Sequence, residues 1–380
     1  KNILIGEVWL CSGQSNMEYL MNLDKRFAKP AKGIDSAAYD ITQKFPAIRL
    51  FKVDKVLSSP DVTTKGWSEA AGEALEKVSA PGFYFAKQLQ KHLNVPIGII
   101  SSSWGGSRIE PWTPLDAYQA SPVFAKDLQT KPLMIDSIVP SKNYNSMIAP
   151  LAPFSIKGFL WYQGESNCML HETDRYTDKQ QVLIESWRQK WNDTSLPFYF
   201  VQIAPYYYSK RKDKIKHTSE TLPEFWEAQT KSLKIPNTAM IVVSDLVDNL
   251  ADIHPSYKWE VGRRFASVAL ARDYGRKNIV YKSPSFQKAK LKKGKVIITF
   301  ADATVLKTND GKLPNWFEIA GEDKHYLTAK AVIEGNKVIL TNTALSKPQY
   351  VRFAWDETAM PNLVNEANLP AIPFRWANGF

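Results

Sequence analysis

The sequence predicts an α/β protein with a parallel sheet, followed by a smaller C-terminal antiparallel β domain. Up to about residue 275, short apolar runs alternate with amphipathic stretches, which is typical of strands and helices alternating along a parallel sheet. After residue 276, polar and apolar residues alternate at every second position between tight turns, which indicates antiparallel strands. We therefore expect a first domain over residues 1–275 and a β-rich accessory domain over residues 276–380.

The first strand is expected over Ile3–Cys11, an apolar run without proline that is interrupted by Ser12-Gly13. Ser15 follows immediately, so a sharp turn after a buried strand would lift its hydroxyl out of the sheet. A side chain at Gly13 would crowd such a turn, as it would at the nucleophile elbow of other hydrolases. Most serines in loops only cap or solvate a turn, so Ser15 needs partners from elsewhere in the chain.

The other elements of the first domain follow from the spacing of apolar residues. Ser79 offers an N-cap and Pro81 a first-turn proline for a helix that extends to about Leu93. Each unusual polar segment follows the carboxyl end of a predicted strand, and in open α/β sheets that edge carries the ligand site. Strands are expected over residues 48–53, 96–101, 156–162, 198–203 and 239–244, and helices over 175–191, 223–233 and 255 to about 275.

The accessory domain is expected to contain hairpins. Glu334-Gly335-Asn336 lies between two alternating runs and is a strong hairpin signal. Its strands are expected over residues 296–300, 329–333, 337–340 and 349–355.

Composition leaves open some kinds of partner and argues against others. The 49 Lys and Arg residues exceed the 38 Asp and Glu residues, which gives a net charge of +11 and suits an acidic partner. The lysines are scattered rather than gathered in a recognition motif, so we expect no nucleic acid partner. There is no run of 18 apolar residues, and a membrane span is not expected. No zinc-type cysteine spacing, Walker loop or dinucleotide fingerprint occurs, so neither a metal nor a cofactor is expected.

The two cysteines, Cys11 and Cys168, imply no disulfide framework. We interpret both as small buried apolar groups, with a bridge between them as the alternative.

Ser15 could act as a nucleophile with an imidazole to take its proton and a carboxylate to orient that imidazole. Among the five histidines, His254 is the best candidate, because it follows the last predicted strand of the sheet and precedes Pro255 at a helix start. Asp252 lies two residues before it. Taken alone, this tetrad could equally be a helix cap, but together with Ser15 the catalytic interpretation is favoured.

An acyl-transfer site also needs donors for the oxyanion. The turn at Gly105-Gly106 would let a backbone N–H approach closely because no side chain intervenes. The Ser15 N–H and the side-chain amide of Gln163 would be further donors. Gln163 could instead tie two loops together, and Glu165 could brace a loop or hold His254.

Four segments occur in the order of the four conserved blocks of SGNH hydrolases, and they match the sialate O-acetylesterase family closely. These blocks are Gly13-Gln14-Ser15-Asn16-Met17, Ser103-Trp104-Gly105-Gly106-Ser107, Trp161-Tyr162-Gln163-Gly164-Glu165-Ser166-Asn167 and Asp252-Ile253-His254-Pro255. The accessory domain is also similar to that family, so the resemblance covers nearly the whole chain. Three segments carry this similarity: Phe317-Glu318-Ile319-Ala320-Gly321, Val351-Arg352-Phe353-Ala354-Trp355 and the segment over residues 368–375.

The resemblance implies a flavodoxin-like SGNH fold with three α/β/α layers, and a secreted or periplasmic enzyme that removes acetyl esters from sugars. It implies Ser15 as nucleophile, His254 as base, and an oxyanion hole from the Ser15 N–H, the Gly105-Gly106 turn and Gln163. SGNH enzymes commonly carry Asp three residues before the histidine, where this chain has Ala251, so either Asp252 or Glu165 would orient His254. Family members usually carry an N-terminal β domain before the first block. The accessory domain is expected to be incomplete without it.

Our leading hypothesis is a carbohydrate O-acetylesterase, and the resemblance favours sialic acid esters as its substrate. The positive charge suits an acidic sugar, either sialic acid or a xylan that bears glucuronic acid. The alternatives are an acetyl xylan esterase and a non-catalytic sugar-binding module. Arg108 follows the glycine pair and could bind a carboxylate, or it could form an ion pair with Glu110. Trp112 could be a platform for a sugar ring, and Asn167 could support the site or bind substrate.

Overall fold

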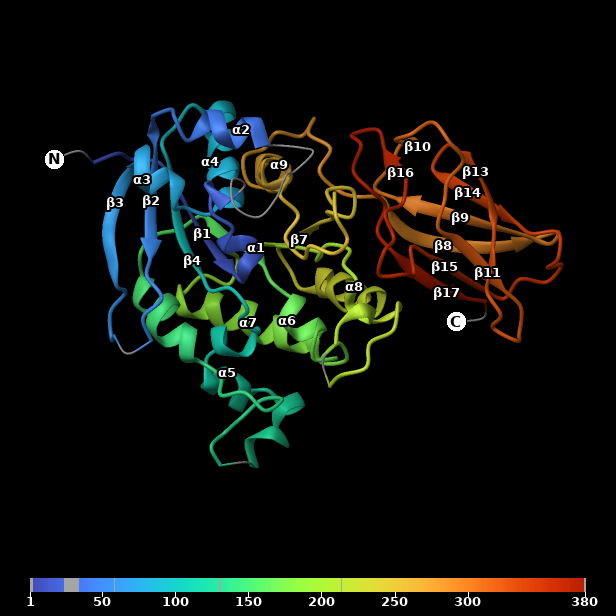
Figure 1. Ribbon diagram of the computed structural model, residues 1–380, viewed down its shortest axis with the longest axis horizontal. Helices are drawn as coiled ribbons and strands as arrows, with labels where there is room; N and C mark the ends of the chain where they lie inside the picture. The colour runs from blue at the N-terminus through green and yellow to red at the C-terminus, as the bar shows by residue number, and fades with distance from the viewer. Residues whose placement is uncertain (1–2, 24–33, 58, 130, 213, 379–380) are drawn as a thin grey trace. The chain divides into compact units, whose positions relative to one another are not determined.

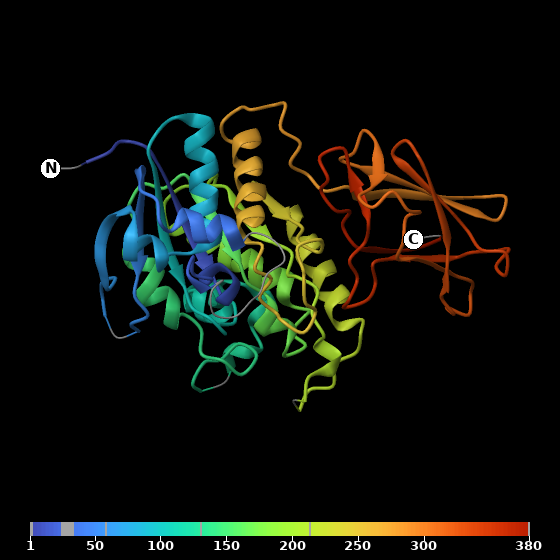
Figure 2. The same cartoon turned by 45° about the horizontal axis from the view of Figure 1, so that its top comes forward.

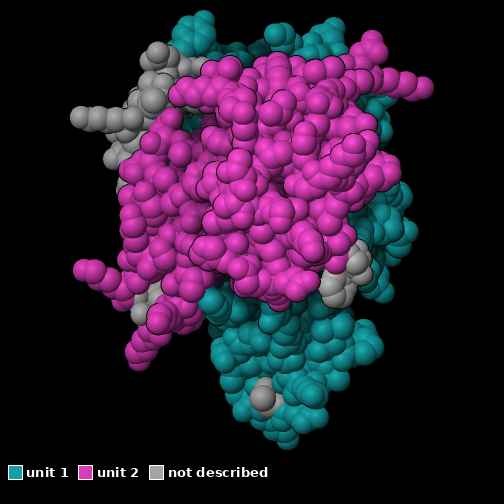
Figure 3. Space-filling view, turned by 90° about the vertical axis from the view of Figure 1, so that its right-hand side faces the viewer, with its two compact units in different colours: residues 1–203, 228–241, 254–276 teal, residues 204–227, 242–253, 277–380 magenta. Residues whose placement is uncertain are grey.

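The computed structural model describes residues 3–23, 34–57, 59–129, 131–212 and 214–378. The chain divides into two compact units, shown in teal and magenta in Figure 3. The division into domains over residues 1–275 and 276–380, which we expect from the sequence, remains a prediction. Unit 1 comprises Lys1–Ile203, Ala228–Ile241 and His254–Arg276, and unit 2 comprises Ala204–Glu227, Val242–Ile253 and Lys277–Phe380.

Unit 1 contains a seven-stranded sheet in the order β3-β2-β4-β1-β5-β6-β7 (Figure 1). Neighbouring strands are parallel except for β2 and β3, which are antiparallel. The predicted parallel α/β class is therefore confirmed, with an antiparallel edge strand that the sequence analysis did not identify. The strands are β1 (Glu7–Gly13), β2 (Phe45–Val53), β3 (Thr64–Ala70), β4 (Ile97–Ser103), β5 (Gly158–Tyr162), β6 (Phe198–Val201) and β7 (Thr238–Ile241).

Helices cover both faces of this sheet, which gives the expected three layers. α4 (Ala80–Leu93) and α9 (Lys258–Arg272) lie side by side on one face, and α7 (Tyr176–Lys190) lies on the other (Figures 1 and 2). On the first face, Trp9 of β1 packs edge-on against Phe85 of α4, with 5.0 Å between ring centroids. On the second, Trp187 of α7 packs against Trp161 of β5 at 5.7 Å. Further helices are α1 (Ser15–Glu18), α2 (Ile34–Asp40), α3 (Gly72–Glu76), α5 (Leu115–Ala120), α6 (Glu165–Cys168) and α8 (Thr221–Lys231), the last with residues in both units.

The N-terminus of α4 is capped as the sequence predicts. Ser79 Oγ accepts a hydrogen bond from the Gly82 N–H at 3.2 Å. The same hydroxyl donates to the Met17 carbonyl at 2.6 Å. The cap therefore also fixes the short segment that follows Ser15.

Several element boundaries differ from the predictions, and two of these differences lie next to the candidate site. The first strand begins at Glu7 rather than Ile3, because pairing with β4 starts there, and Ile3 and Ile5 are 86% and 92% exposed. The last helix of unit 1 begins at Lys258 rather than at Pro255. The segment that carries His254 is therefore a loop that leads into α9. None of the helices in the described part of the chain is both long and apolar enough to cross a lipid bilayer.

Unit 2 carries the predicted antiparallel strands. They form sheets in the orders β13-β14-β9-β8, β12-β11-β15-β17 and β10-β16. Glu334 pairs with Lys337 across the predicted hairpin, which confirms that turn. The strands are β8 (Ser285–Lys292), β9 (Lys295–Ala301), β10 (Leu306–Thr308), β11 (Phe317–Ala320), β12 (Leu327–Thr328), β13 (Lys330–Glu334), β14 (Lys337–Thr341), β15 (Tyr350–Phe353), β16 (Leu363–Asn365) and β17 (Phe374–Ala377).

Candidate active site

The loops that carry the candidate residues leave the sheet at the same level. β1 lies between β4 and β5, and Gly13 at its end pairs in register with Ser103 on one side and Tyr162 on the other. β2 and β4 lie on one side of β1, whereas β5, β6 and β7 lie on the other. This is a topological switch point, where open α/β sheets bind their ligands at the carboxyl ends of the strands.

Glycine at position 13 is required by the turn that presents Ser15. Gly13 has φ +140°, and a Cβ there would lie 2.2 Å from the carbonyl oxygen of Tyr162. The crowding predicted from the sequence is therefore confirmed. The next residue, Gln14, donates its N–H to the same carbonyl at 3.0 Å, and α1 begins at Ser15. The Ser15 N–H lies in the first turn of α1, where amides have no acceptor within the helix.

Ser15 and His254 lie in hydrogen-bond contact. His254 Nε2 is 2.8 Å from Ser15 Oγ, although 239 positions separate the two residues. A serine hydroxyl that donates to a neutral imidazole is poised to lose its proton to that base as it attacks a carbonyl carbon. The structure thus brings together the two residues selected from the sequence, and their catalytic roles remain predictions.

Glu165 and Asp252, the two carboxylates considered as partners of His254, lie in different units. Asp252 lies in unit 2, and its N–H donates to the Asn249 carbonyl at 3.1 Å. Glu165 lies in unit 1 with His254 and is 1% exposed. Its Oε1 accepts from Asn16 Nδ2 at 2.6 Å, and its Oε2 has no hydrogen-bond partner within the described residues. Burial raises the pKa of the Glu165 carboxyl, while the hydrogen bond from Asn16 and the charge of Lys258 partly oppose that rise.

The glycine pair forms a tight turn directly beside the serine. The Ser107 N–H donates to the Trp104 carbonyl at 3.3 Å and closes the turn. Gly106 has φ +74° at the third position, a conformation that favours glycine there. A Cβ on Gly105 would make an ordinary contact of 3.4 Å with the Ser15 Cβ, but it would lie only 3.2 Å from Glu18 Oε2, so the Glu18 carboxylate would have to shift slightly.

One of the predicted oxyanion donors is already in use. The Gly105 N–H donates to Glu18 Oε2 at 2.6 Å, and Glu18 Oε1 forms an ion pair with Lys55. The role of Gly105 as an oxyanion donor therefore stays a prediction, and it would require this hydrogen bond to Glu18 to break. The Gly106 N–H has no acceptor within the described residues. The amides of Ser15 and Gly106 remain as candidate oxyanion donors.

Gln163 ties loops together, the alternative that the sequence left open. Its side chain is fully buried, and Nε2 donates to Asn167 Oδ1 at 2.7 Å, Gln14 Oε1 at 3.2 Å and the Ser107 carbonyl at 3.3 Å. Its Oε1 accepts from the Tyr176 hydroxyl at 2.9 Å. An amide nitrogen has only two hydrogens, and acceptors within the protein already compete for both. The role of Gln163 as an oxyanion donor is therefore not supported by its contacts.

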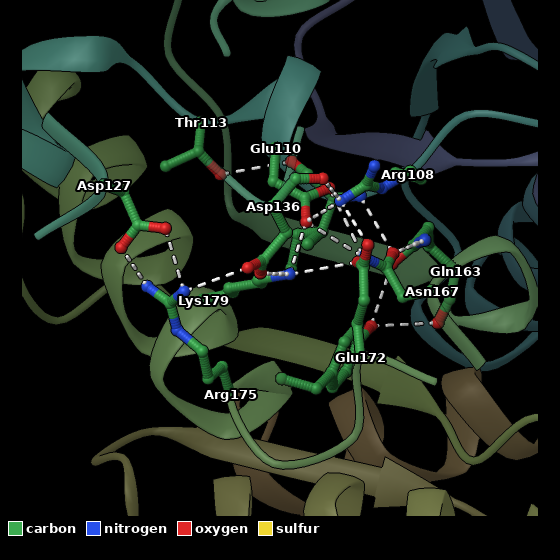
Figure 4. Close-up of polar contacts among 12 residues, drawn as sticks. Arg108, Glu110, Thr113, Asp127, Asp136, Gln163, Asn167, Glu172, Arg175 and Lys179 are labelled. Carbon is green, nitrogen blue, oxygen red and sulfur yellow. Dashed lines mark hydrogen bonds and ion pairs between the residues drawn. The ribbon is translucent and has the colours of Figure 1, made fainter. Parts of the chain in front are cut away.

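A buried network of charges lies behind this loop (Figure 4). Asn167 Nδ2 donates to Glu110 Oε1 at 3.1 Å and to Glu172 Oε2 at 2.7 Å. The fully buried Lys179 ammonium lies 2.5 Å from Glu110, 2.6 Å from Asp136 and 3.0 Å from Glu172. These three carboxylates lie close enough together to hold a cation, but the lysine already occupies the space among them. Asn167 is thus a fully buried support of the loop.

Two predicted substrate contacts need correction. Arg108 forms ion pairs with Glu110 at 3.0 Å and with Glu172, so its guanidinium belongs to the buried network, as the alternative interpretation proposed. Trp112 is 0% exposed, and its indole N–H donates to Ser107 Oγ at 2.8 Å. A ring without an accessible face cannot serve as a platform for a sugar.

Both cysteines are buried and free, so no bridge joins Cys11 to Cys168. Burial raises the pKa of the Cys11 thiol, which keeps it protonated and unreactive.

The sequence analysis missed several residues that shape the site, notably Glu18, Lys55 and Lys179. Glu18 lies three positions after Ser15 on one short helix, and that spacing places side chains on one face. This signal was available in the sequence. Lys55 and Lys179 come from distant segments, and nothing in their local sequence indicates the partners that they meet.

Comparison with known proteins places the chain among carbohydrate esterases. Residues 5–271 match the model of the family described as carbohydrate esterase, sialic acid-specific acetylesterase. The sialate O-acetylesterase of Mus musculus is 31% identical over 93% of this chain and 73% of that protein. The Homo sapiens sialate O-acetylesterase is 32% identical over 84% of this chain, which spans only 63% of the human protein. A crystal structure of a carbohydrate acetylesterase from Xanthomonas citri superposes with a TM-score of 0.83 and 33% identity, covering 98% of this chain and 81% of that one.

Proposed function

This chain belongs to the carbohydrate esterase family of sialic acid-specific acetylesterases, and we propose that it removes acetyl groups from sugars with Ser15 as the nucleophile and His254 as its base. The observation that carries the proposal is the 2.8 Å contact between Ser15 Oγ and His254 Nε2. That contact lies at the carboxyl edge of the sheet, beside the switch point where ligands bind in such folds.

The geometry supports an acyl-enzyme mechanism. Ser15 Oγ attacks the acetyl carbonyl carbon while its proton passes to His254 Nε2. The N–H groups of Ser15 and Gly106 stabilise the oxyanion of the tetrahedral intermediate. The bond between the acetyl carbon and the sugar oxygen then breaks, and His254 gives its proton to that oxygen, which leaves as the sugar hydroxyl. A water molecule, deprotonated by His254, attacks the acetyl-Ser15 ester, and acetate leaves as Ser15 recovers its proton.

Sialic acid is the sugar that we propose as the preferred substrate. The two mammalian relatives are named sialate O-acetylesterases, and the net charge of +11 favours an acidic sugar over a neutral one. The resemblance to this family also leads us to propose secretion or export to the periplasm. Fractionation of cells that express a tagged protein tests this last point, and retention in the cytoplasm would contradict it.

The decisive test compares wild type with Ser15→Ala on a small chromogenic acetyl ester. We expect acetate release by wild type and only background release by the variant. A serine-reactive phosphonate should label wild type and leave Ser15→Ala unlabelled, which also distinguishes an enzyme from a sugar-binding module. Equal hydrolysis by the two proteins would reject Ser15 as the nucleophile.

A panel of sugars tests the substrate separately. Acetylated sialosides and acetylated xylo-oligosaccharides are offered at equal concentration, and kcat/KM is measured for each. We expect the sialosides to be cleaved more efficiently. Preference for the xylo-oligosaccharides would retain the esterase and reject sialic acid as its sugar.

A further inference from the structure

A cavity of about 320 Å³, lined by both polar and apolar residues, lies beyond the carboxyl ends of β2 and β4 in unit 1. It is next to the serine, because Glu18 belongs to its wall and also accepts the Gly105 N–H, and Gly105 packs against Ser15. Its volume is at the lower end of the range for small-molecule sites. The polar side chains of its wall are Glu18, Lys52, Asp54, Lys55, Ser101 and Ser103.

Ser103 gives the first sign that this cavity binds something polar. Its side chain is 6% exposed, and its Oγ has no hydrogen-bond partner within the described residues. A buried hydroxyl that makes no hydrogen bond destabilises a fold, so a native example calls for an explanation. Ser103 belongs to the wall of the cavity, so its hydroxyl would gain a partner if the side chain turned toward a ligand hydroxyl bound there.

The charges of the wall indicate the chemical class of that ligand. Two lysines face two carboxylates in the wall, so the cavity is not strongly cationic and does not select a bare anion. The Lys55 ammonium pairs with Glu18 and lies 5.8 Å from the centre of the Trp104 ring. Lys52 donates to the Lys77 carbonyl at 2.9 Å, and burial lowers the pKa of its ammonium. Such a mixture of donors and acceptors matches sugar hydroxyls, each of which donates one hydrogen bond and accepts others.

We propose that this cavity binds the hydroxylated body of the sugar whose acetyl ester is presented to Ser15. The inference rests on the proposed esterase function and adds the place where the sugar sits. Glu18 links the two sites directly, since one of its carboxylate oxygens holds the amide beside Ser15 and the other holds Lys55 in the wall of the cavity.

The test measures selectivity with two substrates. Wild type, Ser103→Ala and Lys55→Met are assayed on an O-acetylated sialic acid and on the chromogenic acetyl ester, which has no sugar. Losing one hydrogen bond to a sugar hydroxyl should lower the ratio of the two kcat/KM values by roughly 3- to 10-fold in Ser103→Ala. Lys55→Met should lower the ratio by at least as much. Lys77→Met is the matched control, because the ammonium of this exposed lysine pairs with Glu73 on the surface, and its ratio should stay at the wild-type value.

A binding measurement separates this inference from the proposed function. Calorimetry measures the affinity of the O-acetylated sialic acid for Ser15→Ala and for the double variant that also carries Ser103→Ala. We expect the sugar to bind Ser15→Ala and to bind the double variant roughly 3- to 10-fold more weakly. Unchanged affinity together with an unchanged selectivity ratio would overturn the subsite. Retained hydrolysis by Ser15→Ala would instead reject the proposed nucleophile and leave the binding result to decide the subsite on its own.

Discussion

Two polar clusters lie near the carboxyl edge of the sheet, and they differ in how much of the hydrogen-bonding capacity of their groups is used. In the first, Ser15 and His254 are half-buried and lie 2.8 Å apart. In the second, Glu110 and Lys179 are fully buried and lie 2.5 Å apart, with further carboxylates around the lysine. A hydroxyl next to an imidazole at a partly open edge can still react, whereas an ammonium surrounded by carboxylates has its hydrogen-bonding capacity used within the protein. Access and unsatisfied bonding capacity therefore separate the reactive cluster from the structural one.

The second cluster supports the first through one side chain. Asn167 donates its amide hydrogens to Glu110 and Glu172, which leaves its carbonyl oxygen to accept from Gln163 at 2.7 Å. Gln163 in turn contacts Gln14, the residue before Ser15, at 3.2 Å. The buried charges thus fix the loop after β5 against the loop that carries the serine. Substitutions in the first cluster should consequently lower activity, and substitutions in the second should lower stability.

The largest effect is expected at the reactive cluster, in His254→Asn. Removing the base that takes the Ser15 proton should lower kcat by about 10²–10⁴-fold. His254 is half-buried and belongs to a loop, so the melting temperature should change little. Steady-state kinetics on the chromogenic ester and a thermal melt test both expectations. If kcat of His254→Asn equalled that of wild type, Ser15 and His254 would not form a reactive cluster.

The buried cluster should respond in the opposite way, through stability. Lys179→Met leaves Glu110, Asp136 and Glu172 without the ammonium that they surround. Breaking a buried ion pair by removing one partner costs about 3–5 kcal/mol of unfolding free energy. Urea denaturation measures this loss, and Lys77→Met, on an exposed ion pair, should show no measurable change. If Lys179→Met were as stable as wild type, the buried cluster would not be the scaffold of the site.

The sequence was sufficient to predict where the reactive cluster would form. Segments that follow parallel strands lie at the same edge of the sheet, so Ser15 and the Gly105-Gly106 turn could be assigned to one edge from the sequence, and the structure pairs their strands, β1 and β4. His254 followed from its place after the last strand of the sheet. The family resemblance added the order of the four blocks, which no single motif would have supplied.

The contacts of individual groups could not be predicted in the same way. Whether the Gly105 N–H meets an oxyanion or Glu18 depends on where a neighbouring helix points one carboxylate. Trp112 follows the glycine pair as a surface platform would, but burial is a property of the tertiary fold and not of local spacing. The edge strand β3 was missed because most of its residues are polar or small and only partly buried, so its sequence lacks the apolar run that marks a central strand.

The smallest expected effect concerns the pH dependence of the buried cluster. Burial and the neighbouring charge of Glu110 raise the pKa of Glu172 to about 7, against the opposing influence of Lys179 and Arg108. A carboxyl whose pKa is higher in the folded than in the unfolded state stabilises the fold while it is protonated. This contribution is complete below the unfolded pKa, near 4.5, and is lost as the pH rises through the folded pKa, near 7. Glu172→Gln stays neutral at every pH, so the unfolding free energy of wild type should fall relative to that of the variant between these two values. A relative gain for wild type over the same range would show that the ion pairs with Arg108 and Lys179 outweigh burial, and that the cluster prefers this carboxylate charged.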